Sequence, residues 1–188
     1  MTYDFDRFVD RRQSDSNKWN KYGADVLPLW VADMDFPSPE PVIRALRERV
    51  DHGFYGYGID LPEFAQVFTE RLRKLYGWSV PPESLVTIPG VIPGFNMAAR
   101  AFAKPGDGIV LQTPSYPPIL RVPTNTALDL REVPLLRQPG GRYEIDFDRF
   151  ATAVARGTKL FLLCNPHNPV GRVFTREELA RLAQLCVK

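Results

Sequence analysis

Cysteine is scarce in this chain, and long hydrophobic runs are missing from it. Only Cys164 and Cys186 occur among the 188 residues, so the sequence indicates neither a disulfide framework nor a zinc site. No apolar run approaches the roughly 18 residues that a membrane-spanning helix needs. The charged N-terminal segment MTYDFDRFVDRR does not resemble a signal peptide. We therefore expect a cytoplasmic protein that does not enter a membrane.

A strong charge bias is missing as well. The chain has 24 basic and 22 acidic residues, which gives a formal net charge of +2. That balance offers no electrostatic attraction for nucleic acid or for an anionic membrane. Hydrophobic residues make up 44% of the chain, enough to build a packed core and to argue against disorder. The sequence therefore indicates a globular protein.

Strand-like and helical segments alternate along the chain. Strands are expected at residues 85–88, 109–111, 128–133 and 160–164. Helices are expected at residues 38–50, 60–75, 91–103, 116–125, 146–154 and 175–186. Ser38, Asp60, Asp146 and Thr175 stand at the starts of four of these helices, where such side chains cap free amides. Apolar strands that alternate with helices predict an α/β fold with a mostly parallel sheet.

The two ends of the chain lack the periodicity of a self-contained domain. Residues 1–36 contain an apolar block, Val26–Ala32, that they cannot bury by themselves. We expect an N-terminal arm that packs on another part of the protein. At the other end the chain stops at Lys188, after a helix, where an α/β unit would normally place another strand. The chain is therefore expected to be a fragment of a longer domain.

A Pro-Gly turn joins the predicted strand 85–88 to the predicted helix 91–103. Backbone N–H groups and the positive end of the helix dipole at such a turn suit a phosphate group. Gly90 would let the backbone approach such a ligand closely. Taken by itself, the turn is better explained as a simple corner between a strand and a helix, because one glycine-containing turn carries little information.

Tyr116 comes after the predicted strand 109–111 and is flanked by prolines. Ligands of open α/β sheets bind beyond the carboxyl ends of the strands. A rigidly held tyrosine at this edge could stack on a planar ring, or it could simply pack over the sheet.

The loop Asn165–Gly171 comes after the predicted strand 160–164 and contains two Asn-Pro steps. Such a stiff loop can present an amide side chain as a fixed hydrogen-bond donor. His167 has no suitably spaced carboxylate and is expected to be a structural or surface residue. An anion-binding turn, an aromatic ring and a fixed amide thus come after three of the four predicted strands. Together they could converge on one planar, phosphorylated ligand.

The segment Asn165–Gly171 resembles the Asn-Pro-x-Asn-Pro-x-Gly signature of the fold-type I pyridoxal-phosphate enzymes, the aspartate-aminotransferase-like class. More narrowly, the chain resembles the cystathionine β-lyase branch of bacterial carbon–sulfur lyases. This resemblance rests on the segments Asp10–Arg12, Lys18–Trp19, Leu27–Phe36, His52–Tyr57 and Leu162–Asn168. The match runs over nearly the whole chain, with its motifs in the expected order. It implies an α/β fold of the aspartate-aminotransferase-like type, in which helices flank a mostly parallel sheet. Residues 1–45 would form the arm and contribute to a small domain, and residues 46–188 would form the first part of an incomplete large domain.

The resemblance implies pyridoxal 5'-phosphate as the cofactor and gives roles to particular residues. Gly90, Val91 and Ile92 would offer backbone amides to the cofactor phosphate. Tyr116 would stack on the pyridine ring, and Asn168 would donate to its phenolic oxygen.

The same resemblance implies two further roles. Tyr57 would reach the phosphate of the neighbouring subunit's cofactor, which implies a homodimer. Ala32 would lie near the substrate carboxylate, although the stretch around it is equally well read as an arm that docks on the core.

The resemblance also implies groups that the chain does not supply. The family's chemistry needs a lysine that binds the cofactor covalently, an acidic partner for the pyridinium nitrogen and an arginine for the substrate carboxylate. None of the lysines matches the family's lysine motif: Lys18, Lys21, Lys74, Lys104, Lys159 and Lys188. No catalytic residue is therefore assigned within the chain, and the 188 residues alone are expected to be inactive.

The function implied for the complete protein is that of a carbon–sulfur β-lyase that releases a thiol, pyruvate and ammonia from a sulfur amino acid. An aminotransferase of the same class would use the same half of the cofactor site. A non-catalytic binding or regulatory protein on this fold would explain the missing lysine if the chain is naturally short. A nucleotide-binding protein is disfavoured, because the Pro-Gly turn matches neither a Gly-x-Gly-x-x-Gly nor a P-loop pattern.

Overall fold

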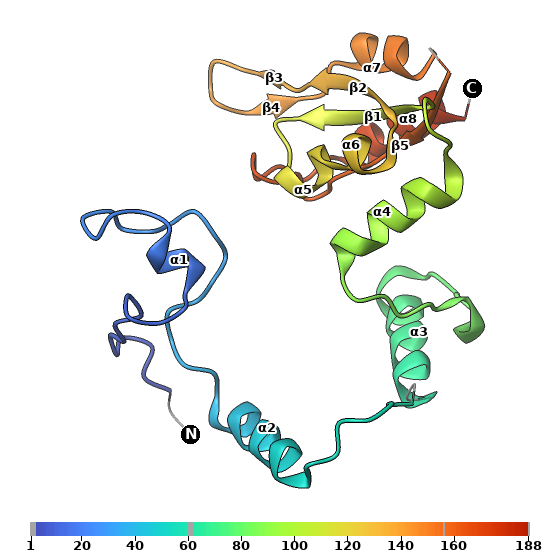
Figure 1. Cartoon of the computed structure of the whole chain (residues 1–188). Helices are drawn as coiled ribbons and strands as arrows, with labels where there is room; N and C mark the ends of the chain where they lie inside the picture. The colour runs from blue at the N-terminus through green and yellow to red at the C-terminus, as the bar shows by residue number, and fades with distance from the viewer. Residues whose placement is uncertain (1–2, 60–61, 156, 188) are drawn as a thin grey trace. The chain divides into compact units, whose positions relative to one another are not determined.

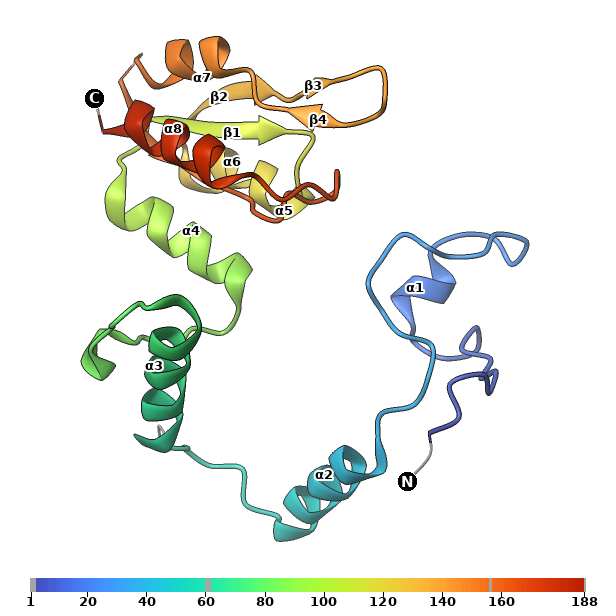
Figure 2. The same cartoon turned by 180° about the vertical axis from the view of Figure 1, so that it is seen from behind.

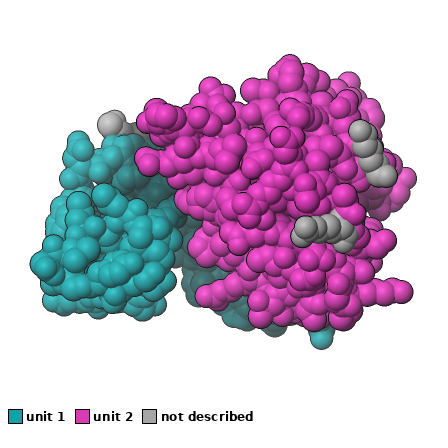
Figure 3. All heavy atoms as spheres, turned by 90° about the horizontal axis from the view of Figure 1, so that it is seen from above, with its two compact units in different colours: residues 1–64 teal, residues 65–188 magenta. Residues whose placement is uncertain are grey.

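The computed structural model of the chain describes residues 3–59, 62–155 and 157–187. It divides into two compact units, unit 1 at residues 1–64 and unit 2 at residues 65–188, which Figure 3 colours separately. The predicted boundary between residues 45 and 46 refers to the domains of the complete fold and stays a prediction.

Unit 1 carries little regular structure. Its helices are α1 (Asn17–Asn20) and α2 (Glu40–His52), and helix α3 (Pro62–Tyr76) begins in unit 1 and continues into unit 2. No residue of α2 is buried, and Leu46 and Val50 on this helix are more than 60% exposed. Among the described residues of unit 1, only Ser16, Lys18 and Pro28 are buried, so this unit has no hydrophobic core of its own.

Unit 2 contains the sheet and most of the helices (Figures 1 and 2). After α3 come the 3₁₀ helix η1 (Pro82–Ser84), α4 (Val91–Phe102), β1 (Gly108–Thr113), α5 (Pro117–Leu120) and α6 (Val122–Thr126). The chain continues through β2 (Asp129–Pro134), β3 (Leu136–Arg137), β4 (Tyr143–Glu144), α7 (Phe147–Val154), β5 (Thr158–Phe161) and α8 (Arg176–Cys186).

The main sheet has three strands in the order β2-β1-β5, and all of its pairings are parallel. Strand β1 is central: Gly108 pairs with Asp129 of β2, and Val110 pairs with Phe161 of β5. Strands β3 and β4 form a small antiparallel hairpin. The predicted α/β fold with a mostly parallel sheet is confirmed.

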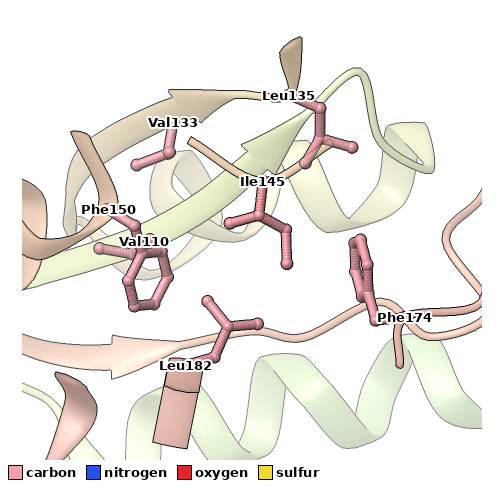
Figure 4. Close-up of a cluster of buried hydrophobic side chains, with 7 residues drawn as sticks. All are labelled: Val110, Val133, Leu135, Ile145, Phe150, Phe174 and Leu182. Carbon is pink, nitrogen blue, oxygen red and sulfur yellow. The ribbon is translucent and has the colours of Figure 1, made fainter. Parts of the chain in front are cut away.

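Hydrophobic side chains cover both faces of β1, because successive residues of a strand point to opposite faces. On one face Val110 packs with residues of α7 and α8, and Figure 4 shows this cluster. It consists of Val110, Val133, Leu135, Ile145, Phe150, Phe174 and Leu182. On the other face Ile109 and Leu111 pack with Ala99 of α4 and Val122 of α6. Helices on both faces thus leave the ends of the strands as the accessible edge.

Several local predictions are confirmed. Helix α4 runs from Val91 to Phe102, and strands β1 and β2 lie where they were predicted. The side chain of Asp146 caps α7 by accepting from the N–H of Arg149. Thr175 and Glu178 form a reciprocal capping box at the start of α8. These features depend on residues close together in the sequence, which is why a pattern can predict them.

The strand predicted at residues 85–88 is wrong. These residues have no strand partner among the residues that the structure describes, and Val86 is 80% exposed. A strand needs a neighbour for its backbone N–H and C=O groups, whatever its own β-propensity. The apolar run at residues 160–164 is likewise shorter as a strand, because β5 ends at Phe161.

The start of α2 also differs from the prediction. Ser38 does not cap this helix: the cap position is Pro39, whose carbonyl accepts from the N–H groups of Val42 and Ile43. The cap predicted at Asp60 lies outside the described residues. The predicted helix at 116–125 is present as two short helices, α5 and α6. No described helix is long and apolar enough to cross a membrane.

Candidate functional site

A cavity of about 580 Å³ opens in unit 2 beside the carboxyl ends of β1 and β5. It is lined by Pro89–Pro93, Phe95, Tyr116, Ile119, Leu162–Pro166 and Asn168. Five of the seven predicted site residues therefore meet in one place: Gly90, Val91, Ile92, Tyr116 and Asn168. The volume lies within the range usual for small-molecule sites.

The turn before α4 contributes three unpaired backbone donors to the cavity. The first N–H groups of any helix lack a partner within the helix. Here the N–H groups of Gly90, Val91 and Ile92 have no acceptor among the residues that the structure describes, and Pro93 has no N–H at all. Gly90 has φ 125° and ψ 165°, a conformation that L-residues rarely adopt. These donors and the helix dipole together favour an anion at this point.

Tyr116 enters the cavity from the segment after β1. It occupies the cap position of α5 and is followed directly by Pro117 and Pro118, whose rings restrict the backbone. Its side chain is 37% exposed. The ring is therefore held in place on the main-chain side and remains accessible to a ligand.

The two asparagines of the loop after β5 have different roles. The side-chain oxygen of Asn165 accepts a hydrogen bond of 3.0 Å from the N–H of Phe174, so its carboxamide is used to hold the loop. The side chain of Asn168 has no hydrogen-bond partner within the described part of the chain, and its backbone N–H points to the sulfur of Cys164 at 3.5 Å. Asn168 is thus the asparagine whose whole carboxamide is without a partner among the described residues, whereas the oxygen of Asn165 is already used.

The three site segments do not all come after strands, which corrects one expectation. Tyr116 and Asn168 come after β1 and β5, which are neighbours in the sheet, but the Pro-Gly turn comes after a segment that is not a strand. The turn reaches the cavity because α4 packs on the sheet through Ala99 and Phe95. The convergence therefore depends on helix packing as well as on strand order.

Tyr57 and Ala32 belong to unit 1, and both are exposed. The side chain of Tyr57 is fully accessible to solvent. Their predicted parts in cofactor and substrate binding stay predictions.

His167 is buried rather than at the surface, with 1% of its area exposed. Its ring nitrogens lie 3.1 Å from the carbonyl oxygen of Cys164 and 2.9 Å from that of Pro114. No carboxylate contacts the ring among the residues described. The ring does not line the cavity. His167 is therefore a buried structural residue in the loop beside the site.

A polar cluster in the arm went unrecognised in the sequence. Asp35 accepts from the ammonium of Lys18 at 2.6 Å, from the indole of Trp19 at 2.7 Å and from the guanidinium of Arg11 at 3.0 Å. Arg11 also pairs with Asp33 at 3.0 Å. Asp33 and Asp35 are separated by one residue, and this spacing gave no sign of their partners, which lie 16 to 24 residues earlier in the chain. The cluster fixes the stretch that contains Ala32 against the preceding part of the arm.

The cluster leads to a prediction about acid. The hydrogen bond from Lys18, together with the next largest, from Trp19, lowers the pKa of Asp35 from 3.8 to about 2. Because the folded pKa lies below the unfolded value, ionised Asp35 stabilises the arm above about pH 4. That contribution is lost as the pH falls toward 2. We expect an NMR titration of the Asp35 carboxyl carbon to give a midpoint near 2, and Lys18→Met to raise it. A midpoint near 3.8 in the unmodified protein would contradict the cluster.

Residues 24–188 match the family model described as aminotransferase class I and II. The chain belongs to this family. The match covers both the Pro-Gly turn and the two-asparagine loop, so the cavity lies wholly within the family region.

Relatives and solved structures agree with this membership. The chain is 40% identical over 190 residues to cystathionine beta-lyase PatB of Bacillus subtilis, covering 98% of this chain and 49% of the relative. Among solved structures, the pyridoxal-phosphate-bound C-S lyase of Staphylococcus hominis is 35% identical with a TM-score of 0.84, over 97% of this chain and 48% of that one. Cystalysin of Treponema denticola, solved with a pyridoxal 5'-phosphate cofactor, is 32% identical with a TM-score of 0.85, over 100% and 49%.

These comparisons confirm the predicted aspartate-aminotransferase-like fold class and the resemblance to the carbon–sulfur lyases. The chain spans about half the length of the curated relatives that it matches. Family membership thus covers the residues of the cavity, whereas the activity of the whole protein is a separate question.

Proposed function

We propose that the cavity of unit 2 is part of a pyridoxal 5'-phosphate site, in an enzyme that cleaves the Cβ–S bond of a sulfur amino acid. The observation that carries the proposal is the convergence of three unpaired amides, an accessible aromatic ring and an unpaired carboxamide on one cavity. Pyridoxal phosphate has an anionic phosphate, a flat ring and a phenolic oxygen, and each of the three features suits one of these groups.

The donor set fits the cofactor without any basic side chain. The N–H groups of Gly90, Val91 and Ile92 would donate to the phosphate oxygens, and the positive end of α4 would add a favourable field. Tyr116 would lie against the ring, and the carboxamide of Asn168 would donate to the phenolic oxygen. When bound, pyridoxal phosphate supplies an electron-withdrawing ring that stabilises negative charge at the substrate Cα.

The apolar walls have a part of their own. Phe95, Ile119, Leu162 and Leu163 line the cavity beside the polar groups. They would exclude water from the bound ring and strengthen the hydrogen bonds to it, because electrostatic interactions are stronger in a medium of low dielectric constant. This half of the site therefore binds and orients. It holds no lysine among its lining residues, and we propose that the covalent lysine lies outside these 188 residues.

Several finer features belong to the same proposal. Tyr57 would donate to the cofactor phosphate of a second subunit in a homodimer, a role that its full exposure in unit 1 permits. Ala32 would lie near the substrate carboxylate. A cytoplasmic location is supported by the two free thiols, Cys164 and Cys186.

Carbon–sulfur cleavage is preferred over amino transfer because PatB is named a cystathionine beta-lyase and the Staphylococcus hominis protein is named a C-S lyase. Aminotransferase activity is the second candidate, because the matching family is that of the class I and II aminotransferases. The two reactions share the cofactor half of the site and diverge once the Cα proton has been lost.

An assay with cystathionine tests the proposal. The assay uses the complete protein that the cell produces, loaded with cofactor. For each cystathionine cleaved it should consume one water and release one thiol, one pyruvate and one ammonia. Amino transfer to a keto acid should be far slower. Equal or faster amino transfer would favour the second candidate.

The 188-residue chain is the matched control for that assay. Incubated with pyridoxal phosphate and borohydride, it should give no adduct fixed on a single lysine. Such an adduct would show that the covalent lysine lies within this chain.

A further inference from the structure

We infer that His167 is a positioning residue that locks the loop carrying Tyr116 to the loop carrying Asn168. The inference rests on the proposed function, because Tyr116 and Asn168 are taken as the contacts to the cofactor ring. His167 itself does not line the cavity, so any effect on the ligand must act through these two neighbours.

The ring of His167 is buried and makes close polar contacts on two sides. Its Nε2 lies 2.9 Å from the carbonyl oxygen of Pro114, 53 residues earlier in the chain. Its Nδ1 lies 3.1 Å from the carbonyl oxygen of Cys164, three residues earlier in the same loop. A carbonyl oxygen can only accept, and a neutral imidazole carries a single N–H, so only one of the two contacts is a hydrogen bond in the neutral ring. In the positioning role of His167, that N–H is at Nε2. The bond from Nε2 is therefore the one that joins the two loops.

The main chain and ring of His167 are also fixed from the other side. Its N–H donates to the carbonyl of Arg172 at 2.7 Å, and its own carbonyl accepts from Gly171 at 2.9 Å. The ring packs edge-on against Phe174 with 5.6 Å between the ring centres. Because the position of the ring is fixed, a hydrogen bond from it restricts the position of the Pro114 carbonyl.

The two ends of this link lie next to the cofactor contacts. Pro114 is two residues before Tyr116, and His167 is directly before Asn168. Ser115, between Pro114 and Tyr116, is buried with 6% of its area exposed, so the segment has little room to move. A shift of the Pro114 carbonyl away from His167 would therefore change the distance between the tyrosine ring and the Asn168 amide.

Two substitutions separate the cross-loop bond from the local one. In His167→Gln the amide nitrogen stands near the position of Nε2 and can still donate to Pro114. In His167→Asn it stands near Nδ1 and can donate only within its own loop. His167→Leu removes both ring nitrogens, and His52→Leu, at an exposed histidine of α2, is the control.

Each variant is made as the complete protein that the cell produces, and its cofactor is removed. Pyridoxal phosphate is then titrated in, and its binding is measured by equilibrium dialysis and by the visible circular dichroism of the bound cofactor ring. We expect His167→Asn and His167→Leu to bind about tenfold more weakly, the size of effect that one lost hydrogen bond gives. The visible circular dichroism of these two variants should also change, because the bound cofactor ring loses its fixed orientation. His167→Gln and His52→Leu should stay within about twofold of the unmodified protein.

The outcomes distinguish this inference from the proposed function. If the unmodified protein binds no pyridoxal phosphate, the proposed function fails. If the unmodified protein binds pyridoxal phosphate and all three His167 variants bind it with the same affinity as the unmodified protein, the positioning role fails and the proposed function stands. If the three variants are equally weak, the ring acts through its shape and the cross-loop bond is not the cause.

A measurement on the unmodified protein covers the case in which a variant does not fold. The Nε2 proton of His167 should exchange slowly with solvent and show a nuclear Overhauser effect to the Ser115 amide. Rapid exchange of this proton would overturn the inference.

Discussion

Phe150→Ala should lower the free energy of unfolding of unit 2 by about 3–5 kcal/mol, the usual cost of truncating a fully buried phenylalanine. Phe150 lies on α7 with none of its area exposed, and its ring meets that of Phe161 edge-on at 4.8 Å between centres. In Figure 4 it lies in the same cluster as Val110 and Leu182. Its removal would leave a cavity between the sheet and both helices of that face. Urea denaturation, monitored by far-ultraviolet circular dichroism, measures the loss.

A matched substitution provides the control. Phe102, at the end of α4, is 74% exposed. Phe102→Ala should change the free energy of unfolding by less than about 0.5 kcal/mol. If the two alanine variants lose the same stability, the cluster around Phe150 does not form the core of unit 2.

Gly90→Ala should weaken the binding of pyridoxal phosphate by about tenfold to a hundredfold. The φ of 125° at Gly90 is strained for any residue with a Cβ, at a cost of about 1–3 kcal/mol. An alanine would rotate the turn to relieve that strain, and the three amides would no longer converge on the phosphate. Space is not the cause, because an added Cβ would meet only the Cδ of Pro93, at 3.7 Å.

Comparison with pyridoxal, which lacks the phosphate, isolates this effect. Equilibrium dialysis should show that Gly90→Ala changes the binding of pyridoxal little, because the ring contacts of Tyr116 and Asn168 remain. Gly140→Ala, in the hairpin loop, serves as the matched control, since an added Cβ there meets no atom within 4 Å. If Gly90→Ala loses the same affinity for pyridoxal as for pyridoxal phosphate, Gly90 does not act through the contacts to the phosphate.

The candidate site was predictable in part, because its three segments carry distinctive residues. The Pro-Gly turn, the proline-flanked tyrosine and the two Asn-Pro steps each indicate a rigid main chain at the end of an element. The sequence could not say which asparagine is free, since this depends on the bond between Asn165 and the Phe174 amide. It also could not place Cys164 or Leu163 in the lining of the cavity.

The strand predicted at residues 85–88 is a second case in which local sequence did not determine the structure. The residues Leu85–Ile88 have the composition of a buried strand, yet they have no strand partner within the described residues. β-Propensity is a local quantity, whereas a strand is completed by a neighbour that is distant in sequence. The hairpin of β3 and β4 was missed for a related reason, because two residues on each side are too few to show a period.

The sequence by itself determined the helix caps at Asp146 and Thr175, the alternation of helices and strands, and the residues that could meet a phosphorylated ring. These depend on side chains within a few residues of one another, where backbone geometry leaves little choice. Only the tertiary structure decided that Gly90, Tyr116 and Asn168 share one cavity, that His167 bridges two loops, and that Asp35 gathers three donors. The hydrogen bonds to Asp35 and the contact between His167 and Pro114 join residues between 16 and 53 positions apart. Packing of the folded chain, not local preference, brings such residues together.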